Sequence, residues 1–177
     1  ALPLSVLVGA QSYAGDTDNL AVGADFAYKL KSNGRIYGGV FLDDLSKFSP
    51  GAFSNQIGIQ AGLDWSNPLT LPNSDVRLQY TRLEPYTYAH NFNINSYTHF
   101  GDELGHPIGP NADQVLARLQ HWVGGHARLW VSFIRTRSGD NYSDDAGNLV
   151  NVGGDPNQGR HPTDSAERIW LAGDLTT

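Results

Sequence analysis

Apolar and polar residues alternate along most of this chain, and the alternation constrains the fold more than any other feature. Segment 56–65 shows it most clearly, since every second residue is apolar: Ile57, Ile59, Ala61, Leu63 and Trp65. The residues between them are Gln56, Gly58, Gln60, Gly62 and Asp64. A helix would mix the two sets, whereas a β-strand places them on opposite faces. The segment is therefore predicted to be a strand with one apolar face.

The same pattern recurs in about eight segments, each with a regular part of nearly ten residues. They are 2–10, 20–30, 35–44, 56–65, 75 to about 88, 114–123, 127–137, and a last one from about Glu167. A tilted strand of about 9–11 residues crosses a bilayer, whereas strands in soluble proteins are usually nearer 5–6 residues. The strand lengths favour a membrane-spanning sheet.

The connections between these segments alternate in length. The short ones are 32–34, 66–74 and 124–126, and the longer ones are 14–19, 45–55, about 91–113 and about 138–166. Successive connections of an up-and-down sheet lie at opposite ends, so all the long ones share one end. Outer-membrane barrels have short periplasmic turns and long extracellular loops. We therefore predict that the loops at about 91–113 and 138–166 face the cell exterior.

The two tightest turns predict how their strands pair. A three-residue turn at 32–34, with Gly34 supplying conformational freedom, pairs Leu30 with Ile36 and Phe26 with Val40. A three-residue turn at 124–126 pairs Leu119 with Val131 and Ala117 with Phe133. Both registers keep apolar residues on one face, and a slip of one residue would move each set to the other face.

Charged side chains are nearly confined to the other face. They are Asp25, Lys29, Arg35, Asp43, Asp64, Arg77, Arg118 and Arg128. An Arg or Lys facing lipid costs about 2–4 kcal/mol at mid-bilayer, which is large against a net stability of roughly 5–15 kcal/mol. Five of these residues lie toward the short turns, and we predict a lumenal ion-pair network among them: Lys29, Arg35, Asp64, Arg77 and Arg128.

A large soluble β-sandwich is the alternative, because its strands also alternate when one face is wet. Strand length and loop asymmetry argue against it. So do Trp65 and Tyr28 near the short-turn end and Tyr80 near the other, which suggest an aromatic girdle. We therefore predict an all-β, antiparallel, up-and-down transmembrane β-barrel, with residues 1–177 as a single unit.

Composition excludes several classes of protein. The chain has no Cys, which excludes disulfides and thiolate metal sites. Its net charge of -6, without a basic run, argues against nucleic-acid binding. The mean hydropathy of -0.37 and the lack of a long apolar run exclude a transmembrane helix. The chain has no Met and begins at Ala1, so we expect a processed or cropped chain.

Residues 77–113 carry a longer motif, RLQYTRLEPYTYAHNFNINSYTHFGDELGHPIGPNAD. It resembles a signature of the capsule assembly Wzi-like family of outer-membrane proteins, in which Tyr-Thr-Arg-x-x-Pro-x-x-Tyr-x-His precedes a Tyr-Thr-containing loop and Leu-Gly-His-x-x-Gly-Pro-Asn-x-Asp. The matching residues are Tyr80, Thr81, Arg82, Pro85, Tyr88, His90, Tyr97, Thr98, Leu104, Gly105, His106, Gly109, Pro110, Asn111 and Asp113. Segments 18–20 and 41–44 also resemble the family, so the match covers roughly the first three-quarters of the chain.

The resemblance implies a barrel of more than eight strands, of which this chain is a segment. It also implies a bacterial outer-membrane location and a non-catalytic role as a lectin that holds capsular polysaccharide at the cell surface. The partners to expect are then outer-membrane lipid, capsular or surface polysaccharide, and other envelope proteins. The alternatives are a porin-like channel or transport barrel, suggested by Gly and charged residues facing the lumen, and a structural part of an envelope assembly.

The glycan hypothesis rests on the aromatic and polar residues near the end of segment 75–88. Rings stack on pyranose faces, while Arg and carboxylates bond to hydroxyls. The competing interpretation is an interfacial girdle with ordinary loop pairing. The candidate binding residues are Arg82, Glu84, Tyr86, Tyr88, His90, Tyr97, His106 and Asn111.

Arg82 and Glu84 share the parity of the apolar residues before them. Either the strand has left the apolar band by Arg82, or a bulge near Pro85 resets the parity.

Metal and catalytic sites are not expected. His99, Glu103 and His106 match no zinc signature, and the acidic loop 140–148 lacks the terminal Glu of a calcium loop. His121 falls on the apolar face and His126 in a short turn, so neither is well placed beside a Ser nucleophile in an outer cleft. We therefore expect no enzyme activity, metal or cofactor.

Overall fold

The fold was analysed in a computed structural model of the chain. The structure describes residues 21–31, 33–45, 55–69, 71–89, 97–100, 102–150, 153–154 and 175–176. Within these ranges, no helix is long and apolar enough to cross a membrane.

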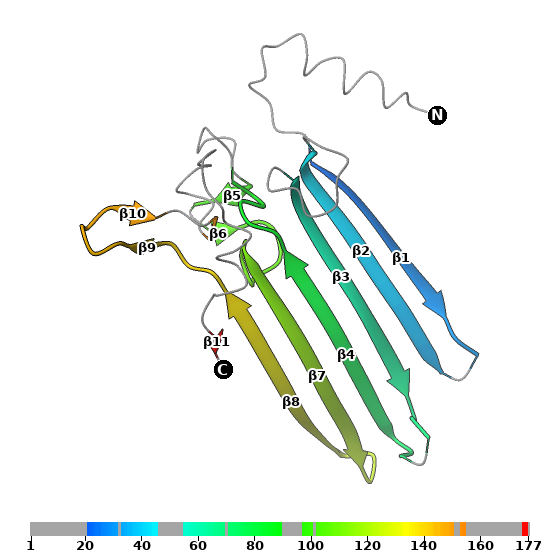
Figure 1. Cartoon of the computed structure of the whole chain (residues 1–177). Coiled ribbons are helices and arrows are strands. Elements are labelled where there is room, and N and C mark those ends of the chain that lie inside the picture. The colour runs from blue at the N-terminus through cyan, green and yellow to red at the C-terminus, as the bar shows by residue number, and fades with distance from the viewer. Residues whose placement is uncertain are drawn as a thin grey trace, which may run out of the picture.

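Six long strands form an antiparallel meander (Figure 1). They are β1 (Val22–Lys29), β2 (Gly34–Leu45), β3 (Asn55–Ser66), β4 (Ser74–Leu83), β7 (Ala112–Val123) and β8 (Ala127–Ser138). Their order in the sheet follows the chain, and the short strand β11 (Leu175–Thr176) pairs with β8 at one edge. The predicted all-β, antiparallel, up-and-down architecture is confirmed.

Six of the eight predicted strands lie among the described residues. The predicted strand 2–10 lies outside them, and only β11 is described from the last predicted segment. The bounds of five strands agree with the prediction to within two residues, but the strand predicted to reach about Tyr88 ends at Leu83. The chain turns there, and Tyr86 and Tyr88 adopt φ of 62° and 75°, outside the β region.

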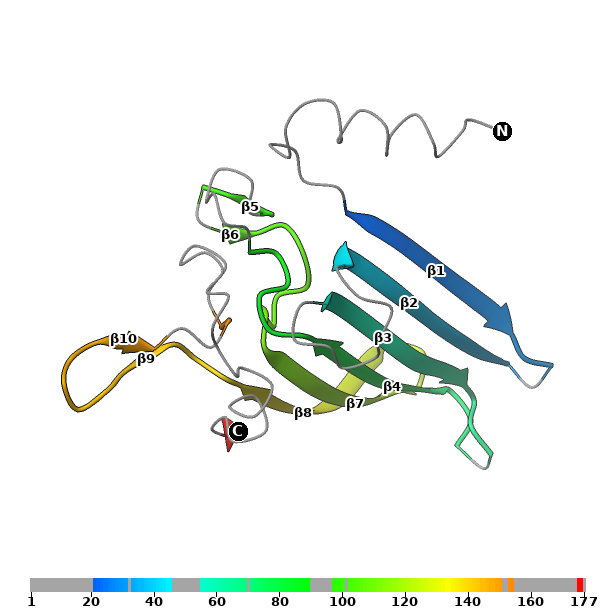
Figure 2. The ribbon, with the colours of Figure 1, turned by 45° about the horizontal axis from the view of Figure 1, so that its top comes forward.

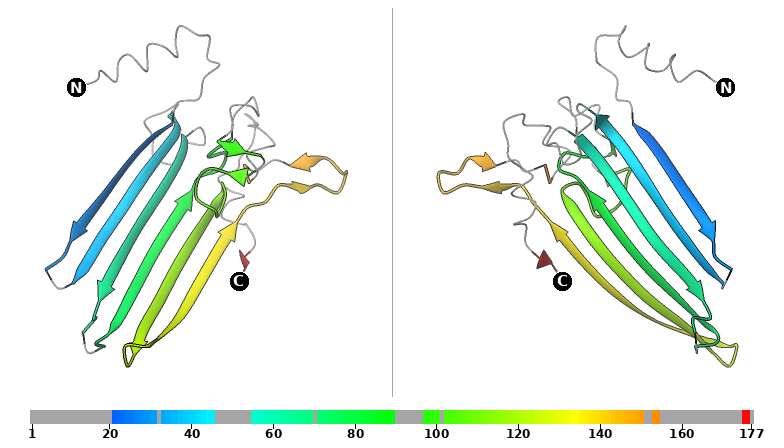
Figure 3. Two further views of the ribbon diagram at one scale, coloured as in Figure 1. Left: turned by 180° about the vertical axis from the view of Figure 1, so that it is seen from behind. Right: turned by 45° about the vertical axis from the view of Figure 1, so that its right-hand side comes forward.

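Short and long connections lie at opposite ends of the sheet (Figures 1 and 3). The β1–β2, β3–β4 and β7–β8 turns share one end, which we call the short-turn end. At the other, the long-loop end, β5 (Thr98–His99) pairs with β6 (Asp102–Glu103). After β8, β9 (Tyr142–Ser143) pairs with β10 (Leu149–Val150).

The β7–β8 hairpin has the predicted register. Leu119 pairs with Val131 and Ala117 pairs with Phe133. The turn places two adjacent glycines, Gly124 and Gly125, at φ of 57° and 74°. Glycine adopts this left-handed conformation without the steric cost that a Cβ would bring.

The predicted β1–β2 register is wrong by two residues. Tyr28, not Leu30, pairs with Ile36, and the partner of Val40 is Ala24 rather than Phe26. The turn is centred one residue earlier, so Asn33 rather than Gly34 has a positive φ, 57°. A shift of two residues leaves every side chain on its predicted face.

The sheet is a single curved layer (Figure 2). One face exposes large apolar side chains on all six long strands: Val22, Phe26, Tyr28, Ile36, Val40, Ile59, Leu78, Val115, Leu119, Val123, Leu129, Val131 and Phe133. Among the described residues, the buried hydrophobic side chains are near the long-loop end: Leu83, Tyr86, Tyr88, Ala89 and Ala112. A soluble sandwich would bury the inner apolar face of its sheet against a second sheet, so the exposed face favours a lipid environment.

Candidate functional site

The motif residues after β4 fold into a buried cluster at the long-loop end. Tyr86 and Asn111 are both 0 % exposed. The N–H of Tyr86 donates to the carbonyl of Gly153 at 3.1 Å, and the N–H of Asn111 donates to the carbonyl of Glu84 at 3.2 Å. The Nδ2 of Asn111 also donates to the carbonyl of Gly139 at 3.0 Å. These bonds join the connection between β4 and β7 to the segment that follows β8.

Tyr88 joins this loop cluster to β2. Its N–H donates to Oδ2 of the buried Asp43 at 2.7 Å, next to a register shift in β2. Its hydroxyl accepts a hydrogen bond from the His106 N–H at 3.0 Å. Its ring centroid lies 5.5 Å from that of Phe41 and 5.8 Å from that of Tyr97. The Tyr88 ring is thus held by contacts from both the sheet and the loop.

A cavity of about 360 Å³ lies beside Tyr88 on the polar face of the sheet. Its volume falls in the usual range for small-molecule sites, about 300–1,000 Å³. Three glycines of adjoining strands, Gly23, Gly39 and Gly58, form part of its wall. We call it the loop-end pocket, and its side chains suited to sugar contacts are Asp25, Phe41, Gln60, Thr81, Tyr88 and His106.

The buried Thr81 hydroxyl is the centre of the pocket's polar contacts. Gln60 Nε2 and Gln79 Nε2 each donate to its Oγ1 at 3.3 Å, and His106 Nε2 lies 3.5 Å from it. The Ile108 N–H donates to His106 Nδ1 at 3.3 Å, which assigns the ring proton of the neutral imidazole to Nε2. Burial lowers the pKa of His106 below its usual value, so the ring is neutral at pH 7.

Asp25 supplies a carboxylate to the same pocket. Cross-strand pairing places Asp25, Gly39, Gln60 and Thr81 in one row across four strands. Because Gly39 has no side chain, space remains between Asp25 and Gln60. Carboxylate, amide, hydroxyl and imidazole groups together offer both donors and acceptors. Beside two aromatic rings, they could bind a sugar through its hydroxyls and its apolar face.

Two of the eight sequence-predicted residues, Tyr88 and His106, line the loop-end pocket. Tyr86 and Asn111 lie inside the loop cluster, where they present no surface to a solute. Tyr97 is 37 % exposed. The aromatic residues after β4 do not alternate along a strand, because that segment turns.

Arg82 and Glu84 form an ion pair at 2.6 Å, and His90 lies outside the described residues. β4 keeps its register with β7 through Leu83, so no bulge resets the parity before Arg82. Arg82 therefore lies on the same face as Leu78 and Tyr80.

A second ion pair lies on the same face at the long-loop end. Arg137 Nε donates to Asp113 Oδ1 at 3.0 Å, and the Tyr80 hydroxyl donates to Asp113 Oδ2 at 3.3 Å. Arg82 and Arg137 both flank Asp113 in the cross-strand pairing. The apolar face therefore ends in a band of paired charges, as expected where a strand leaves the hydrocarbon region.

Sequence reasoning did not include Asp25, Phe41, Gln60 and Thr81 among the candidate binding residues. The alternation places Asp25 and Gln60 on the polar face, but the pocket exists only when β1 to β4 and residue His106 come together. The glycines that open the pocket were the available signal, because a glycine within a strand often marks a close approach of another group.

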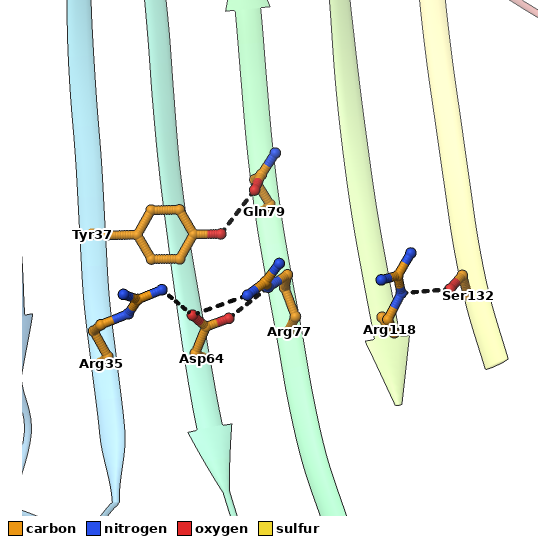
Figure 4. Close-up of polar contacts among 7 residues, drawn as sticks. All are labelled: Arg35, Tyr37, Asp64, Arg77, Gln79, Arg118 and Ser132. Atoms are coloured by element: carbon orange, nitrogen blue, oxygen red, sulfur yellow. Dashed lines mark hydrogen bonds and ion pairs between the residues drawn. The ribbon is translucent and has the colours of Figure 1, made fainter. Parts of the chain in front are cut away.

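The predicted ion-pair network at the short-turn end is confirmed in part (Figure 4). Arg35 and Arg77 both bind Asp64, with NH2–Oδ2 at 2.6 Å and Nε–Oδ1 at 2.7 Å, respectively. The prediction was wrong for Arg128, whose guanidinium carbon lies 5.6 Å from each of the ring centroids of Trp122 and Trp130. These cation–π contacts hold Arg128 near the hairpin turn instead.

No group of three or more His, Asp or Glu could hold a metal ion within the described ranges. The acidic loop is a closed turn, because Asp144 Oδ1 accepts the N–H groups of Ala146 at 3.0 Å and Asn148 at 2.8 Å. Hydrogen bonds from Asn148 lower the pKa of Asp144.

His121 lies beside a serine, which the sequence did not predict. Its Nδ1 is 2.8 Å from Ser74 Oγ. Ser74 is only 3 % exposed, and the two residues are cross-strand partners at the short-turn end of the apolar face.

A curved antiparallel sheet with an exposed apolar face and a polar face containing pockets is the architecture expected of a segment of an outer-membrane β-barrel. The family model described as capsule assembly protein Wzi matches residues 5–167. The chain therefore belongs to this family, which confirms the resemblance carried by residues 77–113 and makes this a capsule-related protein of the outer-membrane type. No curated protein and no solved structure matched the chain.

Proposed function

We propose that this chain belongs to a non-catalytic surface protein that binds or anchors capsular or extracellular polysaccharide. The observation that carries the proposal is the loop-end pocket, which combines aromatic rings with neutral and acidic hydrogen-bonding groups. Membership in a capsule assembly family supports the same substrate class. Binding would use ring stacking for the apolar face of a sugar and the polar groups for its hydroxyls.

The proposed orientation follows from the two ends of the sheet. Lipid covers the apolar face, the long loops at about 91–113 and 138–166 face the cell exterior, and the loop-end pocket lies just inside the barrel. The chain contributes one segment to a larger barrel, whose remaining strands and envelope partners complete its surroundings.

The eight residues predicted from the sequence divide into three proposed roles. Tyr88 and His106 contact the glycan in the pocket, because they line it. Tyr86 and Asn111 hold the loops in place, because they are buried. The remaining four provide contacts at the rim: Arg82, Glu84, His90 and Tyr97.

Gln60 provides a sharp test, because the chain contains a matched control. Gln60 donates to Thr81 at 3.3 Å inside the pocket, and Gln114 donates to Thr136 at 3.0 Å in the same cross-strand row but outside it. We expect Gln60→Leu to weaken binding of purified capsular polysaccharide about tenfold, the loss expected for about one hydrogen bond. Gln114→Leu should leave binding unchanged.

Capsule retention on whole cells provides the second readout. Cells with Gln60→Leu should shed more capsule than cells with Gln114→Leu at equal protein levels. Equal retention together with equal polysaccharide affinity in the two variants would show that the loop-end pocket does not bind the glycan.

A porin-like channel is the second candidate, because ionisable groups line the polar face at the short-turn end. Single-channel recordings of the full-length protein in planar bilayers separate the two functions. Stable conductance steps without polysaccharide affinity would favour a channel. A purely structural role in an envelope assembly predicts neither property, and would appear as specific cross-links in whole membranes.

A further inference from the structure

Positive charge exceeds negative charge in one cross-strand row near the short-turn end. Pairing across the sheet places Lys29, Arg35, Asp64, Arg77, Arg118 and Ser132 side by side, and Figure 4 shows all but Lys29. We call this the basic row. It has four cations and one carboxylate, so Asp64 cannot neutralise it.

Asp64 is already shared by two arginines. It accepts hydrogen bonds from Arg35 and Arg77, while Arg118 is the direct cross-strand partner of Arg77. Like charges at directly opposite positions destabilise a sheet. An anion between Arg77 and Arg118 would relieve this repulsion.

Arg118 is held by a neutral partner rather than by a carboxylate. Its Nε donates to Ser132 Oγ at 2.8 Å (Figure 4). This bond fixes the guanidinium plane, and within the described part of the chain the two terminal nitrogens of Arg118 have no acceptor. They are therefore available to bind a ligand.

A cavity of about 370 Å³ is lined by both Arg77 and Arg118. Asp64 and Asp75 also line it; Asp64 is bound by Arg35 and Arg77, and Asp75 Oδ2 accepts a hydrogen bond from Gln120 Nε2 at 3.5 Å. The space is large enough for a sugar-sized group rather than only a simple ion.

We propose that this cavity is an anion site in which Arg118, together with Arg77, binds the carboxylate or phosphate group of a solute in the lumen. A guanidinium presents paired N–H groups that match two oxygens of such an anion. The four cations of the basic row outnumber the two carboxylates that line the cavity, Asp64 and Asp75, and this excess of positive charge raises the local concentration of anions. Ser132 acts as the positioning residue for Arg118. The site is separate from the loop-end pocket and does not depend on the proposed function.

Titration calorimetry of the full-length protein in detergent, at low salt, tests the proposal with three probes. D-glucuronate and inorganic phosphate should bind, whereas neutral D-glucose should not. Arg118→Gln should weaken binding of both anions by at least about tenfold, since it removes charge-assisted hydrogen bonds. Arg118→Lys keeps the charge but loses the paired N–H geometry, so its loss should be smaller.

Arg135→Gln is the matched control, because Arg135 is an exposed arginine of β8 on the opposite face. It removes the same charge and should leave anion affinity unchanged. Absence of anion binding by the unaltered protein would refute the site, and so would equal losses in Arg118→Gln and Arg135→Gln.

The two anionic probes also identify the source of the bound group. Binding of glucuronate alone would assign the site to acidic sugars, and binding of both probes would assign it to carboxylate and phosphate groups in general. A normal capsule phenotype in Gln60→Leu would bear only on the proposed function, because Gln60 does not line this cavity.

Discussion

Because Gly105 has no side chain, it leaves room for the Tyr88 ring to pack against it. A Cβ at this position would overlap the Tyr88 phenol, whereas a Cβ at Gly23 would meet only one backbone oxygen, at 3.9 Å. The Tyr88 hydroxyl accepts the N–H of the residue that follows Gly105. The small residue at 105 therefore permits both the ring contact and the hydrogen bond.

We expect Gly105→Ala to destabilise the loop cluster by about 1–3 kcal/mol, the usual cost of overpacking. Gly23→Ala is the control and should have little effect. Hydrogen exchange of residues 84–111 measures the difference. Equal protection in the two variants would contradict the assigned packing of Tyr88.

His106 should make the same loop sensitive to acid. Burial lowers its pKa in the folded protein, so the unfolded segment binds more protons below the ordinary value of about 6.5. The loop is unaffected above that pH and loses stability as the pH falls toward the lowered pKa. Protonation also removes the acceptor for the Ile108 N–H.

Hydrogen exchange of residues 104–111 between pH 7.5 and 5, corrected for intrinsic rates, should therefore show increasing exposure at low pH. His106→Gln should remove this pH dependence. If the substituted loop opens over the same pH range as the unaltered loop, another group is responsible.

At the level of the elements, the conformation of the turns determined the strand register, which the alternation of residues does not fix. The β1–β2 turn is closed by the Leu30 N–H donating to the Gly34 carbonyl at 2.7 Å. The left-handed position then falls on Asn33, one of the few residue types besides glycine that tolerate it. From the sequence alone, Gly34 was the expected residue for the left-handed position, but it lies within β2.

The stability of variants at Asn33 should depend on whether the new residue tolerates a positive φ. Asn33→Gly should be nearly neutral, whereas Asn33→Val should cost about 1–2 kcal/mol because of its Cβ branch. Urea unfolding of the full-length protein in lipid vesicles measures both changes. A Val variant as stable as the Gly variant would contradict the positive φ of Asn33.

For the whole molecule, the two faces of the sheet should respond differently to the same charge. Leu78 is 46 % exposed on the apolar face, and Ile134 is 47 % exposed on the polar face. Because exposure is matched, a difference between arginine substitutions at these sites reports what each face contacts.

We expect Leu78→Arg to destabilise the protein in vesicles by about 2–4 kcal/mol if this residue lies near mid-bilayer. Ile134→Arg faces the lumen and should cost far less. The free energy of unfolding in vesicles provides the comparison. Similar costs for the two substitutions would contradict lipid contact on the apolar face.

Several features of the fold could be predicted because they depend on local properties of the chain. Alternation assigns each side chain to a face, and loop lengths separate the ends of the sheet. Gly124 and Gly125 predicted a hairpin whose register is correct, because adjacent glycines in a three-residue connection leave few possible turns. Asp64 shared a face with Arg35 and Arg77, and pairing of neighbouring strands brought these charges together.

The candidate site was less predictable, because it depends on contacts between distant segments. Nothing in the local pattern requires Tyr86 to be buried against Gly153, or Tyr88 to leave the strand and bond to Asp43. Likewise, Arg128 shares the lumenal parity of the predicted network but contacts two tryptophan rings, those of Trp122 and Trp130.

The sequence by itself thus determined that this chain forms an antiparallel sheet with one apolar and one polar face. Period-two alternation is a local property that survives a register error of two residues. Only the tertiary structure decided where the loop-end pocket and the basic row lie. Both are built from residues on several strands, and their geometry depends on strand register, side-chain packing and the return of distant loops to the sheet.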